Sequence, residues 1–296
     1  MNTTHTYNER EAILYGILAV LLWSTVATGF KLGLRVLHIE QLLFLGIGFS
    51  WLFFLIVLII RGGFYISVKD RLTAPLLGII NPFVYYLILF AAYDRLPAHV
   101  AQPLNYTWAI TLAILSVPLL NESLTKRTIA GFLISYAGVV ILIYSSKTQS
   151  ADTIDFLGVG LALLSTLLWA LYWLINKKSQ SDPLSMIFIA FSTALPLSLV
   201  ACLSGPGLPQ LNNEALVFGT WVGLIEMGIT YLLWERAIRR SANTGRIAQL
   251  IFLSPFVSLV FIYFLLGEHI SLGVILSLVF IILGTWITQK LEPKNR

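Results

Sequence analysis

Glu226 is the residue with the clearest chemical potential, because it is an acid inside a long apolar run. It lies 11 residues after Ala215 and 8 residues before Trp234. An acidic group that deep in a bilayer costs about 2.5–3.5 kcal/mol, so it should face the interior of a helix bundle, protonated or paired. It could exchange a proton or bind an amine. Alternatively, it is a structural carboxyl that is hydrogen-bonded to a neighbouring helix.

A candidate partner for Glu226 lies in the third apolar run. Gly78, Asn81 and Tyr85 are spaced at i, i+3 and i+7 and therefore share one face of a helix. The run that carries Glu226 has a glycine and a threonine at the same spacing around it. Pro82 removes a backbone donor beside Asn81, which predicts a kink that is either a gate or ordinary packing.

The fourth apolar run carries Gln102, Asn105 and Tyr106 on one helical face, with Pro103 and Trp108 nearby. Two amides on one face could bind the amino and carboxyl groups of a small zwitterion. Alternatively, they hold neighbouring helices together, as side-chain amides often do in membrane bundles. The tyrosine and the tryptophan would add an amphipathic wall.

An aromatic stripe occupies the sixth run, where Trp169, Tyr172, Trp173 and Asn176 are spaced at i, i+3, i+4 and i+7. Such stripes pack against helices or anchor at the membrane interface, and this interpretation is favoured for Trp173 and Asn176 near the end of the run. Trp169 lies deeper, and it either packs or lines a cavity. An aromatic wall there would favour a flat apolar or aromatic ligand.

Ser24, Thr28 and Lys31 share a face of the first run, and Ser24 is a further candidate for the cavity wall. The Lys31 amine is expected to extend to the lipid headgroups. The alternative is that Lys31 and Lys177 each capture a carboxylate at a mouth of the bundle. In the ninth run, we expect Ser254 to pack and Pro255 to act as a hinge, as Pro103 does in the fourth.

Two acids, Glu122 and Glu268, follow the ends of the fourth and ninth runs. The positive neighbours of Glu122, Lys126 and Arg127, indicate a structural or gating ion pair.

The composition excludes a soluble enzyme, a disordered chain and a nucleic-acid binder. Hydrophobic residues make up 57% of the 296 residues, charged residues 11%, and the mean hydropathy is +0.84, whereas soluble domains have about 25% charged residues. Cys202 is the single cysteine, the four histidines are widely separated, and there is no nucleotide-binding motif. We therefore expect no metal, no cofactor and no nucleotide-hydrolysing subunit.

Ten runs are long and apolar enough to be transmembrane helices, because a span needs about 20 mostly apolar residues. The runs lack two-residue alternation, which favours helices over a barrel, and the first is expected to be a retained span rather than a signal peptide. The predicted spans are Ala12–Phe30, Gln41–Ile60, Ala74–Ala92, Val100–Leu120, Thr128–Tyr144, Leu157–Ile175, Met186–Leu203, Ala215–Trp234, Arg246–Leu266 and Ser271–Gln289.

Lysine and arginine in the connecting loops predict the orientation. With the N-terminus inside, 15 of the 19 basic residues lie on the inside and 4 on the outside, as the positive-inside rule requires. Arg236, Arg239 and Arg240 belong to this signal rather than to an anion site. Both termini are therefore predicted to be cytoplasmic.

The two halves of the sequence resemble each other at a constant offset of 146 residues. This offset aligns Trp23 with Trp169, Tyr85 with Tyr231, and Gly138 with Gly284. Five helices per copy is an odd number, so the second copy must be inverted in the membrane, as in carriers that work by alternating access. We therefore expect one five-helix repeat over 1–145 and an inverted repeat over 146–296.

The ten spans in two halves, the early tryptophans of spans one and six, and the glutamates after spans four and nine resemble the drug/metabolite transporter superfamily. The segment 266–268, Leu-Gly-Glu, is similar to the end of its EamA-type repeat, whereas the first copy reads Leu-Asn-Glu at 120–122. A narrower resemblance is to its bacterial aromatic amino-acid exporters, carried by the following segments. These are 22–25 (Leu-Trp-Ser-Thr), Asn105-Tyr106 with Trp108, Trp169-Ala170 with Tyr172, Asn176 and Lys177, and Tyr231 with Trp234. Ala109 and Glu226 depart from that branch.

The resemblance implies an all-α inner-membrane carrier for amino acids or similar small metabolites. We expect it to work by rocking one repeat against the other, with Glu226 as a candidate for proton coupling. The alternatives are an exporter of drugs or unrelated metabolites, an intramembrane enzyme, and a channel or a non-transporting sensor. The expected partners are the bilayer and a small-molecule substrate, with no nucleic acid.

Overall fold

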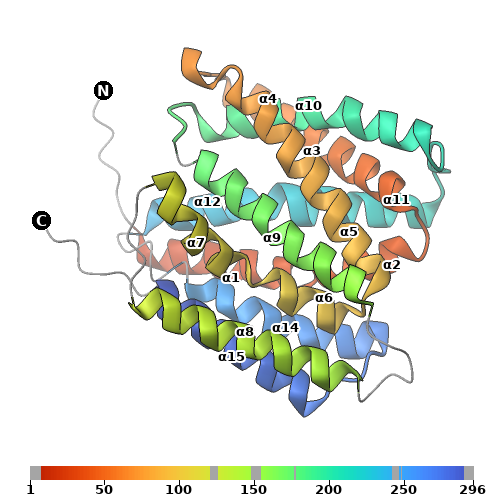
Figure 1. Ribbon diagram of the computed structural model, residues 1–296. Coiled ribbons are helices and arrows are strands. Elements are labelled where there is room, and N and C mark those ends of the chain that lie inside the picture. Colours follow the sequence, from red (N-terminus) through yellow and green to blue (C-terminus); the bar gives the residue numbers. More distant parts are fainter. Residues whose placement is uncertain are drawn as a thin grey trace, which may run out of the picture.

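A computed structural model describes residues 8–120, 126–147, 155–176, 178–241, 247 and 249–289. All regular elements in these ranges are helices. They form one bundle, in which α8 and α15 lie side by side along one flank and α10 lies on the opposite flank with α3 and α4 (Figure 1).

Within the described residues, six helical segments are long and apolar enough to cross a membrane. They are Glu9–Leu34, Ile39–Arg61, Thr73–Arg95, Phe156–Asn176, Pro183–Ser204 and Asn213–Ala237. Three shorter apolar helices accompany them, namely Ile129–Ser145, Leu250–Leu266 and Leu272–Ile287. The described part of the chain is therefore all helical, with the apolar helices of a multi-pass membrane protein.

Helices of the first half fall where the sequence predicts its first five spans, with ends that differ by a few residues. They are α1 (Glu9–Ser24), α2 (Val26–Leu34), α3 (Ile39–Arg61), the short η1 (Val68–Asp70), α4 (Thr73–Gly78), η2 (Ile79–Val84), α5 (Tyr85–Arg95), α6 (Ala98–Asn105), α7 (Trp108–Leu120) and α8 (Lys126–Lys147). The boundaries follow local chemistry. Asn8 Oδ1 accepts a hydrogen bond from the Glu11 N–H (3.3 Å) at the start of α1, and Gly62 ends α3 with a φ of 67°.

Helices of the second half likewise follow the remaining predicted spans. They are α9 (Phe156–Asn176), α10 (Pro183–Ser204), α11 (Asn213–Thr220), η3 (Trp221–Ile229), α12 (Thr230–Arg240), η4 (Gln249–Leu253), α14 (Ser254–Phe261), η5 (Ile262–Leu266) and α15 (Leu272–Gln289). Asp182 caps α10, whose first residue is Pro183. Asn212 caps α11, and Gly267 ends η5 with a φ of 68°.

The third and eighth spans are among those that depart from regular α-helical geometry. In the third span, Asn81 has extended dihedral angles (φ −146°, ψ 120°), the Asn81–Pro82 peptide is cis, and η2 is a π-helix. In the eighth span, the π-helical η3 contains Glu226. π-Helical turns change which side chains share a face and often occur at functional sites.

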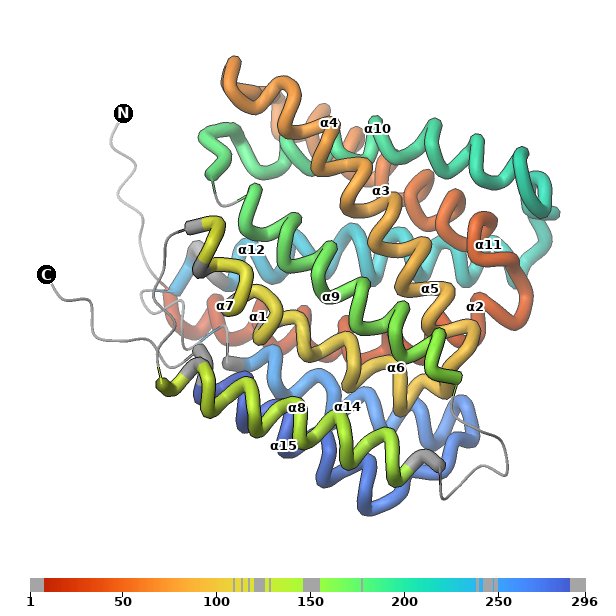
Figure 2. The backbone as a smooth tube through the Cα atoms, in the orientation of Figure 1, coloured from red at the N-terminus to blue at the C-terminus, as the bar shows by residue number. Residues whose placement is uncertain are grey.

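Helices from the two halves are interleaved along the whole bundle (Figure 2). The most extensive helix contacts all join one half to the other, and they are α8 with α15, α1 with α12, α3 with α10, α5 with α9, and α7 with α9. At the crossing of α8 and α15, Gly138 lies so close that an added Cβ would be 2.7 Å from the Ser277 carbonyl oxygen. The Ser135 hydroxyl donates a 2.9 Å hydrogen bond to the Ile281 carbonyl there. The halves therefore do not form two separate bodies.

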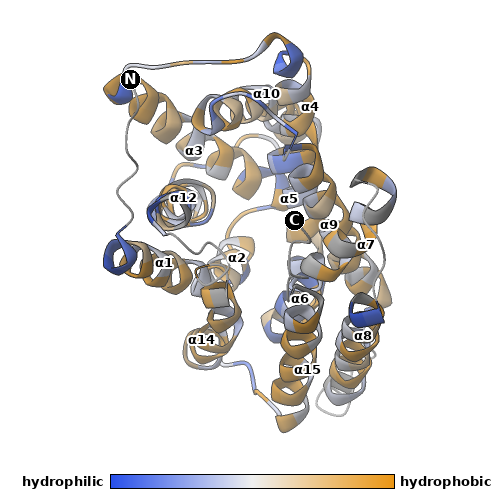
Figure 3. Ribbon diagram, turned by 90° about the vertical axis from the view of Figure 1, so that its left-hand side faces the viewer, coloured by the Kyte–Doolittle hydropathy of each residue, from blue (hydrophilic) through white to orange (hydrophobic). Residues whose placement is uncertain are grey.

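Most of the helical ribbon is coloured as hydrophobic, and hydrophilic stretches are few (Figure 3). Ile59 and Ile60 are 70% and 80% exposed, which fits a lipid-facing surface.

Candidate functional site

Glu226 is held between two aromatic side chains from other spans. The Tyr86 hydroxyl on α5 donates a 2.9 Å hydrogen bond to Glu226 Oε1, and Trp23 Nε1 on α1 donates a 3.4 Å bond to the Glu226 backbone carbonyl. The second carboxyl oxygen, Oε2, is buried and has no hydrogen-bond partner. One oxygen of the carboxyl is thus hydrogen-bonded, and the other is buried without a hydrogen-bond partner.

This arrangement corrects the partner that the sequence predicts. The expected face held Asn81 and Tyr85, but the residue that binds Glu226 is Tyr86. The helix is interrupted at Asn81, so the i, i+3, i+7 rule for a regular helix no longer relates Asn81 to α5. Gly78 packs instead against the backbone of Ala190 in α10.

Aromatic rings from four spans connect beside this carboxyl. Tyr85 contacts Tyr86 (ring centroids 4.7 Å apart) and Trp169 (4.9 Å). Trp169 in turn contacts three further rings of spans four and six, namely Trp108, Tyr172 and Trp173. Trp173 stacks on Tyr231 of the eighth span, with centroids 6.3 Å apart and planes 9° apart. Trp169 therefore lies at the centre of an aromatic cluster, and Trp173 packs in the same cluster.

A second aromatic pair includes Trp23, which contacts the Glu226 backbone. Trp23 and Trp234, from the first and eighth spans, have ring centroids 5.5 Å apart. The sequence pattern predicted no role for Tyr86. It indicated Trp23 only as part of the internal repeat and of the family resemblance. Only the folded arrangement shows that both contact Glu226.

The polar face predicted in span four does not act as one unit. Asn105 Nδ2 donates a 3.0 Å hydrogen bond to Ser165 of α9 and also faces the Tyr85 hydroxyl. Tyr106 faces Ser254 of α14. Gln102 Oε1 is buried without a partner, as is Asn81 Oδ1 in the third span. Asn105 thus has hydrogen-bond partners in neighbouring spans, whereas the Gln102 side-chain oxygen has none.

Spans one and nine meet through small hydroxyl side chains. Ser24 donates to the Val20 carbonyl (2.6 Å) and lies 3.3 Å from the Ser254 hydroxyl. Pro255 lies in the first turn of α14, directly after the 3-10 segment η4. Pro103 lies within α6, close to the end of that helix at Asn105.

Lys31 does not extend to the lipid headgroups in this structure, contrary to the expectation. Its Nζ donates hydrogen bonds to the carbonyls of Tyr93 (2.6 Å) and Leu96 (3.0 Å) at the C-terminus of α5. A cation there satisfies carbonyls that have no partner within the helix. Its expected counterpart, Lys177, lies outside the described residues, as does Glu122.

Glu268 caps the neighbouring helix α6. Its two oxygens accept from the N–H groups of Ala98 (2.9 Å) and His99 (3.0 Å), and His99 Nδ1 lies 2.7 Å from Oε2. Burial raises the pKa of Glu268, but His99 and these N–H groups outweigh burial and hold the pKa below its ordinary value. The partner of this acid is thus a histidine from the first half.

The other end of the bundle carries a network that the sequence did not suggest. We call residues 62–72 and 178–185 the loop clamp. Asp70 Oδ2 accepts from the hydroxyls of Ser181 (2.6 Å), Ser67 (2.7 Å) and Ser179 (3.0 Å) and from the Gln180 N–H (2.9 Å). These bonds, with Ser181 first, lower the pKa of Asp70 to about 2.

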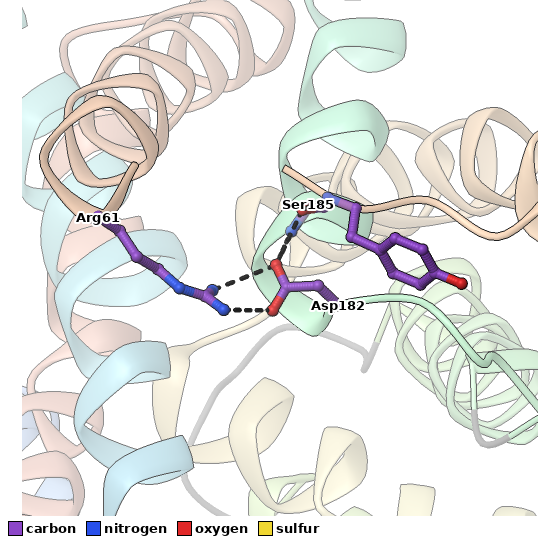
Figure 4. Close-up of polar contacts among 4 residues, drawn as sticks. Arg61, Asp182 and Ser185 are labelled. Atoms are coloured by element: carbon purple, nitrogen blue, oxygen red, sulfur yellow. Dashed lines mark hydrogen bonds and ion pairs between the residues drawn. The ribbon is translucent and has the colours of Figure 1, made fainter. Parts of the chain in front are cut away.

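Beside the loop clamp, Arg61 forms a bidentate ion pair with Asp182, at 2.8 and 3.2 Å (Figure 4). Asp182 also accepts from the Ser185 N–H (3.0 Å) and hydroxyl (2.8 Å). The loop after α3 is therefore fastened to the start of α10, across the two halves of the chain.

A groove of about 370 Å³ lies on the outer flank, away from Glu226. It is lined by Thr111, Ile114, Leu115, Tyr136, Gly160, Leu163, Leu164, Thr166 and Leu167. Leu164 and Leu167 are 42% and 41% exposed, so the groove opens toward the lipid side.

Comparison with known proteins identifies the family. The model of the EamA-like transporter family matches residues 10–144 and again residues 156–289. The chain belongs to the EamA-like transporter family. It is therefore a membrane transporter rather than an enzyme.

Relatives of this EamA-like protein carry transporter names. A probable amino-acid metabolite efflux pump of Salmonella typhimurium is 25% identical over 287 residues, 92% of each chain. The aromatic amino acid exporter YddG of Ancylobacter novellus is 23% identical over 244 residues, 79% of this chain and 81% of that protein. An uncharacterized transporter of Clostridium kluyveri is 28% identical over 211 residues, 64% of this chain and 66% of that protein. A crystal structure with 19% identity superposes with a TM-score of 0.67 over 95% of this chain and 98% of that one.

Proposed function

We propose that this EamA-like transporter is a secondary-active exporter of amino acids or similar small metabolites, with Glu226 at the centre of its binding site. The observation that carries the proposal is the Glu226 carboxyl, which has one oxygen bound by Tyr86 and the other buried without a partner. Ionisable groups inside transmembrane segments typically mark substrate or ion pathways. Two relatives named for amino-acid or metabolite export support the substrate class.

The proposal includes ten spans arranged as two inverted repeats, over 1–145 and 146–296, with both termini cytoplasmic and the chain in the inner membrane. The charge bias of the loops supports the orientation. A cavity wall built from Ser24, Asn81, Tyr85, Gln102, Asn105, Tyr106, Trp108 and Trp169 belongs to the same proposal.

Alternating access requires some helices to move relative to the others. Because helices of the two halves are interleaved, the contacts between the halves limit which helices can move together. Rocking one five-helix half against the other as a rigid body would break the α8–α15, α1–α12 and α3–α10 contacts together. Interfaces this well packed tend to be preserved as units. We therefore propose that the moving groups mix helices of both halves, with bends at Pro82, Pro103 and Pro255.

Proton coupling through Glu226 is part of the proposal, since a carboxyl can carry a proton in one half-cycle and a ligand in the other. Glu226→Gln cannot release a proton. This variant should therefore lose the pH dependence of transport while exchange at saturating substrate persists.

The function is tested with purified full-length protein in liposomes, by counterflow of labelled tryptophan and then of a panel of amino acids. We expect saturable counterflow of the labelled substrate, and we expect unlabelled substrate to inhibit it. If no amino acid gives saturable flux while a chemically unrelated drug or metabolite does, the amino-acid proposal is wrong and a different export substrate is indicated.

A further inference from the structure

Among the described residues, six buried side-chain polar atoms have no hydrogen-bond partner. Two are the hydroxyls of Thr28 and Ser258, one is the donor Trp173 Nε1, and the other three can only accept. Glu226 Oε2, Asn81 Oδ1 and Gln102 Oε1 are buried oxygens without partners. A carboxylate oxygen and amide oxygens require a donor, and a buried ionised carboxylate also requires a positive charge. The ligand that satisfies Glu226 is therefore a hydrogen-bond donor, and a cation satisfies it best.

The described part of the chain supplies no such cation close to Glu226. Every lysine and arginine in the described residues lies in a loop or within two turns of a helix end. The Lys31 amine is bound to the Tyr93 and Leu96 carbonyls. For the same reason, no lysine or arginine of the described residues is placed to pair with the carboxylate of a ligand at Glu226.

The aromatic surroundings also favour a cation. Tyr86 contacts Glu226 directly, and its ring packs against Phe30 and Phe90, with centroids 6.3 and 5.6 Å away. Trp23 is fixed by its bond to the Glu226 backbone. Electron-rich ring faces stabilise organic cations, most strongly where water is excluded.

We infer that the Glu226 site selects its ligand by a protonated amine beside an aromatic or apolar body, and that a ligand carboxylate is not required. The inference rests on the proposed function and specifies its substrate class. Amines without a carboxyl group, and not only zwitterionic amino acids, are then ligands. The matching carboxylic acid without the amine is not.

The test measures binding by titration calorimetry, with the full-length protein in lipid nanodiscs. The probes are tryptamine, tryptophan and indole-3-propionate, which share the indole ring. Tryptamine and indole-3-propionate differ only in whether the two-carbon chain ends in an amine or a carboxylate. We expect wild-type protein to bind tryptamine at least about tenfold more tightly than indole-3-propionate, the ratio expected from one charged contact.

Glu226→Gln should weaken tryptamine binding by about tenfold or more. Glu214→Gln is the matched control, because Glu214 lies in the same span on an exposed turn of α11; it should bind tryptamine like wild type. Tyr86→Phe keeps both the carboxyl and the ring, so it should retain the preference for the amine. That comparison stands even if Glu226→Gln does not fold.

Three results would overturn the inference. They are indole-3-propionate binding as tightly as tryptamine, unchanged tryptamine affinity in folded Glu226→Gln, and no tryptamine binding to wild type. Failure of the proposed function looks different, because amine binding without saturable flux would remove the transport proposal and leave the amine site standing. Saturable tryptophan flux without a preference for the amine would support the transport proposal and remove the amine site.

Discussion

The Tyr86 hydroxyl and the Glu226 carboxyl meet at 2.9 Å although they are 140 residues apart in the chain. The bond joins the third span to the eighth and fixes one oxygen of the acid, while the other oxygen is buried without a hydrogen-bond partner. The same hydrogen bond therefore connects two spans and positions the carboxyl that we propose binds the ligand.

Tyr86→Phe removes this bond without changing the ring. Hydrogen bonds to charged groups contribute about 1.5–3 kcal/mol, so we expect transport at subsaturating substrate to fall by roughly tenfold. Initial rates over a range of substrate concentrations check this. Tyr65→Phe is the control, since Tyr65 is 60% exposed in the loop clamp; an equal loss there would contradict a specific role for Tyr86.

The Asp70 network should stabilise the protein over a wide pH range. Its pKa is lowered from 3.8 to about 2, so its contribution is fully present above pH 3.8 and is lost as pH falls toward 2. We expect Asp70→Asn to lower the stability by about 2 kcal/mol, with the same loss of Tm at pH 7 and pH 5. Thermal unfolding in detergent measures both. A loss that disappears at pH 5 would contradict the lowered pKa.

Glu268 should likewise stabilise the opposite end of the bundle. Its pKa lies below the ordinary 4.5, so its contribution is present above that value and is lost as pH falls through the lowered pKa. Glu268→Gln should therefore lower the Tm at pH 7 and bring the variant closer to wild type in strong acid. Asp94→Asn, an exposed acid at the same end, should leave the Tm unchanged. Equal Tm values for Glu268→Gln and wild type at pH 7 would refute the capping role.

The contact between α8 and α15 should tolerate no added volume. In Gly138→Ala, the new Cβ would lie 2.7 Å from the Ser277 carbonyl oxygen and 2.9 Å from Phe280 Cβ, and such overpacking costs about 1–3 kcal/mol. Gly160 of α9 has no neighbouring atom within 4 Å of an added Cβ. Gly160→Ala should therefore be neutral or stabilise by up to about 1 kcal/mol. Unfolding curves that rank the two variants the other way would contradict this account of the interface.

Much of the fold could be predicted from the sequence, because apolar runs of about 20 residues are required by the bilayer itself. The helices accordingly lie where those runs predict them. The face that meets Glu226 could not be read from spacing, since the break at Asn81 and the π-helical turns of η2 and η3 do not follow the 3.6-residue period. Tyr86 was missed for this reason, and Tyr85 was assigned to the wrong contact.

The sequence also contains no pattern that predicts the interleaved packing of helices from the two halves or the loop clamp. Internal similarity between halves predicts repeats, but it does not say which helices pack together. Asp70 and Ser181 lie in short polar loops that look alike from composition. Only the folded chain brings the loops after α3 and α9 together.

The most direct test of the central role of Glu226 is transport driven by a pH gradient in proteoliposomes, with wild type, Glu226→Gln and Glu214→Gln compared. The account predicts gradient-stimulated flux for wild type and Glu214→Gln. For Glu226→Gln it predicts no stimulation, with exchange persisting at saturating substrate. Stimulation of Glu226→Gln equal to wild type would contradict it.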